Sequence, residues 1–142
     1  MIKKDEDFPA YLDRQKLAGF LHKSLKPFED PVSDIDSGID YALSSEPGRG
    51  GFVLIAESAG HLAGALVMLR TGMKGYVPEN LLLFVAVAPS MRGKGIGAML
   101  VRKGVQISDG DIKLHVEHAN PAKRLYYRLG FTSKYAEMRY IK

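Results

Sequence analysis

An apolar stretch that runs into alternating glycines is the feature that most constrains the fold of this chain. Residues 81–88 are all apolar, as in a buried strand, and Gly93, Gly95 and Gly97 follow before a predicted helix over 95–108. Glycines let backbone N–H groups turn toward a close ligand, and the start of a helix adds about half a positive charge. The segment therefore predicts an anion site, most naturally for a phosphate or pyrophosphate.

Three phosphate-binding patterns compete for this segment. A nucleotide P-loop requires Lys-Ser or Lys-Thr after the last glycine, which is absent here. A dinucleotide fingerprint requires G-x-G-x-x-G, whereas these glycines alternate as G-x-G-x-G. The acyl-CoA pyrophosphate pattern R/Q-x-x-G-x-G/A is matched at every fixed position by Arg92-Gly93-Lys94-Gly95-Ile96-Gly97. A glycine-rich turn that serves only tight packing between strand and helix would have the same sequence pattern. The residues downstream are needed to distinguish the two interpretations.

The remaining chain predicts an α/β domain around a mixed sheet. Apolar spacing predicts helices over 8–25 and 34–44, and Asn120-Pro121 opens a short helix that Gly130 ends. The expected strands are 52–57, 61–70, 81–88, 113–118 and 135–141. No repeat or long linker divides the sequence, so we expect a single domain over 1–142.

Composition excludes several function classes. The 142 residues include no cysteine, which rules out disulfides, thiolate metal sites and a cysteine nucleophile and suits a cytoplasmic location. The charged N-terminus predicts no secretory signal, and the longest apolar run is far short of the roughly 20 residues of a membrane span. The net charge of +4 is scattered along the chain, so no nucleic-acid partner is expected. No third ligand accompanies His115 and Glu117, so no metal site is expected.

The chain resembles the GNAT superfamily of acetyl-CoA-dependent N-acetyltransferases from about Phe52 to Phe131. Residues 120–131 look like the family's N-x-x-A-x-x-L-Y-x-x-x-G-F helix, and they follow the glycine turn after one helix and one strand. The resemblance implies a mixed, mostly antiparallel sheet flanked by helices, with two splayed parallel strands in the centre. The first strand of the family is expected to be missing or reduced, because Met1–Phe8 is short and acidic.

The resemblance also implies how acetyl-CoA is bound. In the family it lies in the gap between the splayed strands, here 81–88 and 113–118. By similarity, the backbone at Val85 and Val87 pairs with the pantetheine amides, and the amides of 93–97 hold the pyrophosphate. Asn120 is expected near the pantetheine arm, although a helix N-cap is an equally good role for it.

Two residues are the candidates for acid–base chemistry. Tyr126 matches the family's acid, which protonates the departing CoA thiolate, with Tyr127 as a substitute. Leu81 stands where many relatives carry a carboxylate base, and Glu79 is two residues earlier. A solvated strand-end charge is the simpler interpretation of Glu79, and a water chain can replace a dedicated base.

The acceptor is the least constrained part of the prediction. Phe28, Tyr76, His115 and Glu117 are candidate substrate residues, the last two on one strand face. We expect a small-molecule or peptide amine that attacks directly in a ternary complex, in a monomer or homodimer. A non-catalytic acyl-CoA-binding or interaction module on the same fold is the alternative.

Overall fold

The computed structural model describes residues 1–142 and contains a four-stranded sheet in the order β1-β2-β3-β4. The β1–β2 and β2–β3 pairs are antiparallel and the β3–β4 pair is parallel. This confirms the predicted fold class, a mixed and mostly antiparallel sheet flanked by helices. In chain order the elements are η1 (Asp5–Asp7), α1 (Arg14–Ser24), α2 (Val32–Ala42), β1 (Gly51–Ser58), β2 (His61–Arg70), β3 (Asn80–Val87), η2 (Pro89–Met91), α3 (Ile96–Ile107), β4 (Ile112–Leu114) and α4 (Ala122–Arg128).

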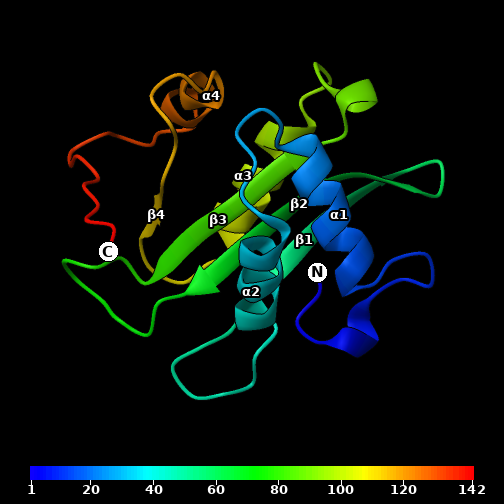
Figure 1. Ribbon diagram of the computed structural model, residues 1–142, viewed down its shortest axis with the longest axis horizontal. Helices are drawn as coiled ribbons and strands as arrows, with labels where there is room; N and C mark the ends of the chain where they lie inside the picture. The colour runs from blue at the N-terminus through cyan, green and yellow to red at the C-terminus, as the bar shows by residue number, and fades with distance from the viewer.

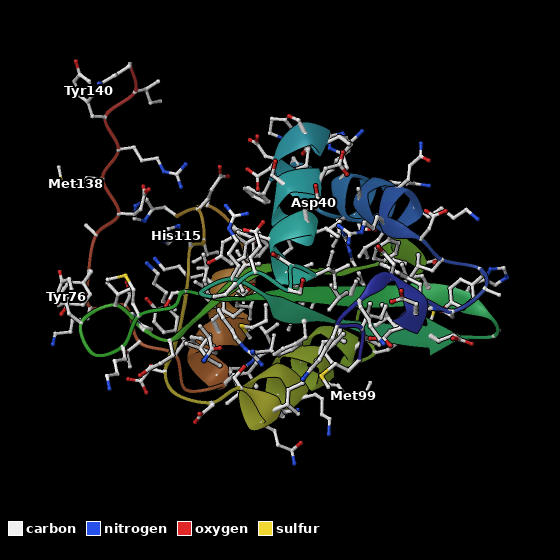
Figure 2. The ribbon with its side chains drawn as sticks, turned by 90° about the horizontal axis from the view of Figure 1, so that it is seen from below. Asp40, Tyr76, Met99, His115, Met138 and Tyr140 are labelled. Carbon is white, nitrogen blue, oxygen red and sulfur yellow. The ribbon has the colours of Figure 1, made fainter.

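Helices cover both faces of the sheet. α1 and α2 lie on one face and α3 on the other, as Figures 1 and 2 show from two directions; Asp40 of α2 and Met99 of α3 mark the two outer sides. The buried apolar residues accordingly form two clusters. Leu21 and Ile39 pack with Phe84 in the first, and Leu100 packs with Leu66 in the second. The sheet is therefore the middle of three layers, and β3 lies between two neighbouring strands.

A β-bulge in β3 coincides with the point where β3 and β4 separate. On β2, Val67 faces Phe84 and Met68 faces Leu82, so Leu83 is an extra residue in β3. The parallel ladder with β4 ends at the pair Leu82 and Leu114, although β3 continues to Val87. A bulge bends its strand and increases the local twist. The predicted splay of the two parallel strands is thus present, and the bulge gives its physical cause.

The N-terminal end differs from the expected long helix over 8–25. Asp13 caps α1, because its carboxylate accepts a hydrogen bond from Lys16 N at 2.8 Å, so the helix begins only at Arg14. Tyr11 lies before the helix and donates to Glu57 of β1 at 2.9 Å. The predicted helix 34–44 is also shifted, since α2 begins at Val32 directly after Pro31.

The expectation of a missing or reduced first strand is confirmed. Ile2 forms an isolated antiparallel bridge with Val53 of β1, with hydrogen bonds of 2.8 and 2.9 Å in the two directions. Ile2 is buried in the first apolar cluster. The first strand of the family is therefore reduced to a single residue, Ile2, that pairs with β1.

Two strand predictions near the C-terminus are wrong. β4 covers only Ile112–Leu114 instead of 113–118, and the segment 135–141 forms no strand. A strand needs a neighbouring edge to pair with, and three residues of β4 offer a very short one. Met138 and Tyr140 are each 89% exposed, and their side chains point away from the domain in Figure 2.

Candidate active site

The edge of β3 that faces β4 has free backbone groups beyond Leu82. Ala88 N donates to Ala63 O at 2.8 Å, so the backbone of Ala88 is directed to β2. Backbone groups alternate between the two edges of a strand, and those of Val85 and Val87 are therefore directed away from β2, to the open side. Both predicted pantetheine-binding positions thus lie where a ligand can extend the sheet in place of β4.

The glycine turn leads from this open edge into α3. Gly93 and Gly95 both have φ of +78°, a conformation that L residues with a side chain adopt at a cost. The first backbone hydrogen bond of α3 runs from Met99 N to Gly95 O at 3.0 Å. The three amides before Met99 consequently have no partner within the helix. Gly95 caps the helix without a side chain, so these donors are available to a ligand.

The two charged residues of the turn have different surroundings. Arg92 donates through Nη2 to the backbone oxygen of Ser24 at 2.7 Å, at the end of α1, and its Nε lies 3.5 Å from Val87 O. Lys94 is exposed and its Nζ contacts only Met91 Sδ, at 3.9 Å. Lys94 is therefore the cation free to meet a bound anion, whereas Arg92 is engaged within the protein.

These residues fit the pyrophosphate of an acyl-CoA. A Cβ added at Gly93 or Gly95 meets no atom within 4 Å, so open space surrounds both positions of the turn. Unpaired amides, the positive end of α3 and the Lys94 ammonium all favour an anion there. Gly97 differs, because a Cβ there meets Leu125 and Val87 at 3.6 Å, an ordinary packing distance. Gly97 therefore allows α3 to pack against its neighbours, and the last position of the R/Q-x-x-G-x-G/A pattern, which Gly97 occupies, admits alanine.

Asn120 stands at the start of α4, where its side-chain oxygen accepts from Ala122 N at 2.9 Å. The helix-start role considered for this residue is therefore observed. Asn120 is two residues before Ala122, one fewer than in the N-x-x-A spacing of the family's helix. Its role near the pantetheine arm stays a prediction.

Tyr126 is the only buried residue of α4, with 9% of its surface exposed. Its ring packs edge-on against Phe131 at a centroid distance of 5.7 Å and belongs to the second apolar cluster. Burial raises the pKa of Tyr126 to about 12, because the phenolate loses its hydration. The phenol is therefore protonated throughout the neutral range and can donate a hydrogen bond or a proton. Tyr127 is half exposed on the same helix.

Glu79 is held against the turn before β4. Its Oε2 accepts from Asp111 N at 2.8 Å, and a Cβ on Gly110 would lie 2.6–2.7 Å from its side-chain atoms. Hydrogen bonds from backbone amides, its own first and then that of Asp111, lower the pKa of this carboxyl. A lowered pKa makes a carboxylate a weaker base, so this arrangement suits a structural role better than proton abstraction.

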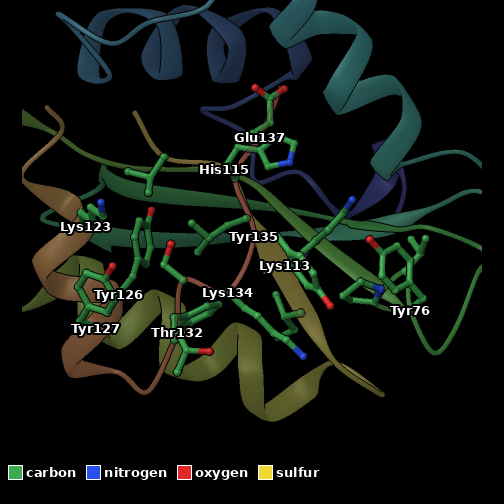
Figure 3. Close-up of a pocket in the computed structure, with 18 residues that line it drawn as sticks. Tyr76, Lys113, His115, Lys123, Tyr126, Tyr127, Thr132, Lys134, Tyr135 and Glu137 are labelled. Atoms are coloured by element: carbon green, nitrogen blue, oxygen red, sulfur yellow. The ribbon is translucent and has the colours of Figure 1, made fainter. Parts of the chain in front are cut away.

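A cavity of about 490 Å³ lies beside Tyr126 (Figure 3). α4, β4, the loop before β3 and the segment after α4 all contribute to its wall. Of the predicted substrate residues, Tyr76 and His115 line the cavity, and Tyr76 packs edge-on against Tyr135 at 5.8 Å. The structure thus brings these two together with Tyr126, although Tyr76 is otherwise 82% exposed.

The other two predicted substrate residues do not line this cavity. Phe28 is half-buried in the loop after α1, where its N–H donates to Leu25 O at 2.9 Å. Glu117 is exposed beyond the end of β4, so His115 and Glu117 do not share a strand face as predicted. The reason is the early end of β4 at Leu114, after which the period-two alternation of side chains no longer applies.

Sequence reasoning missed the lysines of the cavity. Lys113, Lys123 and Lys134 line it together and come from three segments that are separate in the sequence. Lys123 is one helical turn before Tyr126, which is the only sequence signal that could have found it. No group of three or more metal-binding side chains converges anywhere in the chain, and no helix is both long and apolar enough to cross a bilayer.

Solved structures with the same fold include several acetyltransferases. A putative acetyl transferase from Pyrococcus furiosus is 21% identical, with a TM-score of 0.64 over 90% of this chain and 91% of its own. The aminoglycoside N-acetyltransferase AAC(6')-Iy in complex with CoA is 20% identical, with a TM-score of 0.65 over 91% and 88%. A transcriptional regulator from Bacillus halodurans is 17% identical, with a TM-score of 0.64 over 91% and 93%. At these identities the likeness shows the fold alone.

Sequence comparison identifies the family directly. No curated protein matches the chain. The profile of the acetyltransferase (GNAT) domain matches residues 49–133, which is more than half of the chain and spans the open edge of β3, the glycine turn and Tyr126. The protein therefore belongs to the GNAT acetyltransferase family, the family that the glycine turn and the α4 helix predicted.

Proposed function

We propose that this protein transfers an acetyl group from acetyl-CoA to the amine of an acceptor by direct attack in a ternary complex. The open edge of β3 next to the glycine turn is the observation that carries the proposal. It offers the backbone of Val85 and the N–H of Val87, whose oxygen lies 3.5 Å from Arg92 Nε, for an amide-rich arm. It also offers unpaired amides at the start of α3 for a pyrophosphate. The family match and the CoA complex of one structural neighbour support the same cofactor.

Acetyl-CoA supplies the acetyl thioester, whose C–S bond breaks as the acceptor nitrogen forms the new C–N bond. Only a neutral amine has the lone pair that attacks the thioester carbon. An alkyl amine with an ordinary pKa near 10 is protonated in neutral solution, so it must lose a proton before it reacts. A backbone N–H on the open edge of β3 stabilises negative charge on the carbonyl oxygen. The Tyr126 hydroxyl donates a hydrogen bond and its proton to the departing sulfur, and the proton that the acceptor nitrogen loses on becoming an amide restores the phenol.

The raised pKa sets the size of the Tyr126 contribution. A phenol with a pKa of about 12 is a weaker acid than a thiol with an ordinary pKa near 8.5, so complete proton transfer is uphill. Its contribution therefore belongs at the lower end of general acid catalysis, about 100-fold. The raised pKa also keeps the Tyr126 hydroxyl protonated at the pH values, near 10, at which the acceptor amine begins to be neutral.

The deprotonation of the acceptor has two candidate routes in this proposal. Glu79 is the predicted base, but the bond from Asp111 N and the lowered pKa do not favour it. A water chain to solvent is the second route, and it needs no dedicated base. Replacement of Glu79 by glutamine separates the two routes.

Aminoglycosides are one acceptor class to test, since one structural neighbour is an aminoglycoside N-acetyltransferase. The alternative function is acyl-CoA binding without catalysis, and another neighbour with the same fold is described as a transcriptional regulator.

Titration calorimetry with acetyl-CoA and the Lys94→Ala variant tests the cofactor site that both functions share. We expect saturable binding that weakens in the variant; no binding to the intact chain contradicts both functions.

A further inference from the structure

The cavity beside Tyr126 is positively charged, and acetyl transfer as such does not require this. Its lining contains three lysines and one glutamate. Lys113 comes from β4, Lys123 from α4 and Lys134 from the segment after α4, and Figure 3 shows them around one space. None of the three is within 4.0 Å of a carboxylate. Like charges repel, so three unpaired ammonium groups around one cavity favour an anionic occupant.

The single acidic residue of the lining does not neutralise these charges. Glu137 forms an ion pair with Arg139, which is the next residue but one in the same segment. Its carboxylate is therefore already paired with a cation outside the lining. His115 also lines the cavity, and an imidazole adds no negative charge.

Aromatic rings provide the rest of a binding surface. Tyr76 and Tyr135 pack edge-on at 5.8 Å, and Lys134 Nζ lies over the Tyr135 ring at 5.5 Å. Tyr127 lines the same cavity from α4. The volume of about 490 Å³ falls in the range of roughly 300–1,000 Å³ that is typical of small-molecule sites. The cavity thus combines flat apolar surfaces with cations.

We propose that the acceptor is a small amine that also carries an anionic group, a carboxylate or a phosphate. Lys113, Lys123 and Lys134 hold the anionic group, the tyrosine rings contact the body of the molecule, and its amino group faces Tyr126. The inference rests on the proposed function, because it names the acceptor class of that same site. It also separates this chain from its aminoglycoside-modifying neighbour, since an aminoglycoside carries several ammonium groups and the lysines repel them.

Binding to the protein saturated with CoA tests the charge preference without requiring turnover. Two matched pairs serve as probes: phenylalanine with phenylalaninamide, and phosphoethanolamine with ethanolamine. The pairs also distinguish a carboxylate from a phosphate as the preferred anion. In titration calorimetry we expect the anionic member of at least one pair to bind about tenfold more tightly than its partner. This is the gain in affinity expected when an anionic group makes a few exposed contacts with lysine ammonium groups. Kanamycin, a polycation, is expected to bind no better than ethanolamine.

Lysine variants establish whether the cavity causes the preference. In the double variant Lys123→Gln and Lys134→Gln we expect the tenfold ratio to fall to about two- or threefold, because one lysine remains. Lys16→Gln, on the exposed side of α1 and outside the cavity, is the control for loss of charge and is expected to keep the full ratio. Circular dichroism checks that each variant is folded.

Each outcome decides one of the two proposals. Equal binding within both pairs, no measurable binding of any probe, or a ratio that survives the double variant overturns the inference about the acceptor. Thiol release in the same samples reports on the proposed function separately. Selective binding of an anionic amine without thiol release contradicts acetyl transfer alone, and transfer to kanamycin in preference to the anionic amines contradicts the acceptor class alone.

Discussion

Arg92 donates a hydrogen bond through Nη2 to the backbone oxygen of Ser24, at 2.7 Å, and so joins the glycine turn to the last residue of α1. Its Nε lies 3.5 Å from Val87 O, at the end of the strand before the turn. The guanidinium thus connects the turn, α1 and β3 and positions the turn, while Lys94 is the cation free to meet an anion. A helix that packs over the sheet face is in this way connected directly to the proposed cofactor site.

The two cations are therefore expected to respond differently to truncation. Arg92→Ala removes the bond to Ser24 O and is expected to lower the free energy of unfolding by about 1 kcal/mol. Lys94→Ala removes no such bond, so its unfolding free energy is expected to stay within about 0.5 kcal/mol of the parent. Urea denaturation measures both. Equal destabilisation by the two variants contradicts the division of roles.

The same pair of variants has a second expected difference, in cofactor affinity. Lys94→Ala is expected to raise the dissociation constant for acetyl-CoA about fivefold, the effect of one exposed charge contact of about 1 kcal/mol. Because the stability of this variant is expected to stay near that of the parent, a loss of affinity is attributable to the contact itself. An unchanged dissociation constant by calorimetry contradicts the assignment of Lys94 as the free phosphate-binding cation.

Alanine substitutions in the glycine turn separate backbone conformation from packing. Gly95 has φ of +78°, so Gly95→Ala is expected to cost about 1 kcal/mol and to weaken acetyl-CoA binding as the turn shifts. Gly97 lies inside α3 with room for a Cβ, so Gly97→Ala is expected to retain binding and to gain up to about 1 kcal/mol in helix propensity. Thermal unfolding and calorimetry compare the two. The reverse order of stabilities contradicts the role given to Gly95.

The buried phenol of Tyr126 predicts a stability change in alkali. Its pKa is about 12 in the folded protein and near 10 in the unfolded chain, so above pH 10 the unfolded state loses a proton that the folded state keeps. By linkage, stability is fully present below pH 10 and falls as the pH rises toward 12, by about 2 kcal/mol. Tyr126→Phe lacks this contribution. Relative to Tyr126→Phe, the parent is expected to lose about 2 kcal/mol of unfolding free energy over this interval, and parallel curves contradict the buried phenol.

Glu79 is expected to tolerate loss of its charge. Glu79→Gln keeps an oxygen that accepts from Asp111 N, so the turn before β4 is preserved. If water serves the deprotonation, kcat/KM falls less than about threefold, whereas loss of a general base costs about 100-fold or more. Steady-state kinetics with the best acceptor decides this, and Glu79→Asp, which shortens the reach to Asp111, is the comparison for geometry. A 100-fold loss in Glu79→Gln restores Glu79 as the base.

The sequence predicted the parts of this fold that depend on local pattern. The apolar run 81–88 and the alternating glycines gave the strand, the turn and α3, because glycines at positive φ and a buried strand leave local signatures. The splay between β3 and β4 followed only from the family resemblance. Its cause, an extra residue at Leu83, is a matter of register with β2 and has no signature within β3 itself.

The parts that were missed depend on distant contacts. Alternation in 135–141 suits a strand, but β4 ends at Leu114 and provides little edge for pairing. The cavity lysines come from segments whose meeting depends on the path of the chain after α4, which no local pattern encodes. Tyr76 lines the cavity and Phe28 and Glu117 do not, and the role of Tyr76 toward a substrate stays a prediction.

Release of free thiol from acetyl-CoA, followed with and without an amine panel and in Tyr126→Phe, tests acetyl transfer most directly. We expect amine-dependent release above the hydrolysis rate, a fall in kcat of about 100-fold in Tyr126→Phe, and an unchanged dissociation constant for acetyl-CoA in that variant. Phe131→Leu, which alters the ring packed on Tyr126 but keeps the hydroxyl, is the control for disturbed packing. Thiol release that no amine accelerates would contradict acetyl transfer to an amine, and full activity in Tyr126→Phe would contradict the acid role of Tyr126.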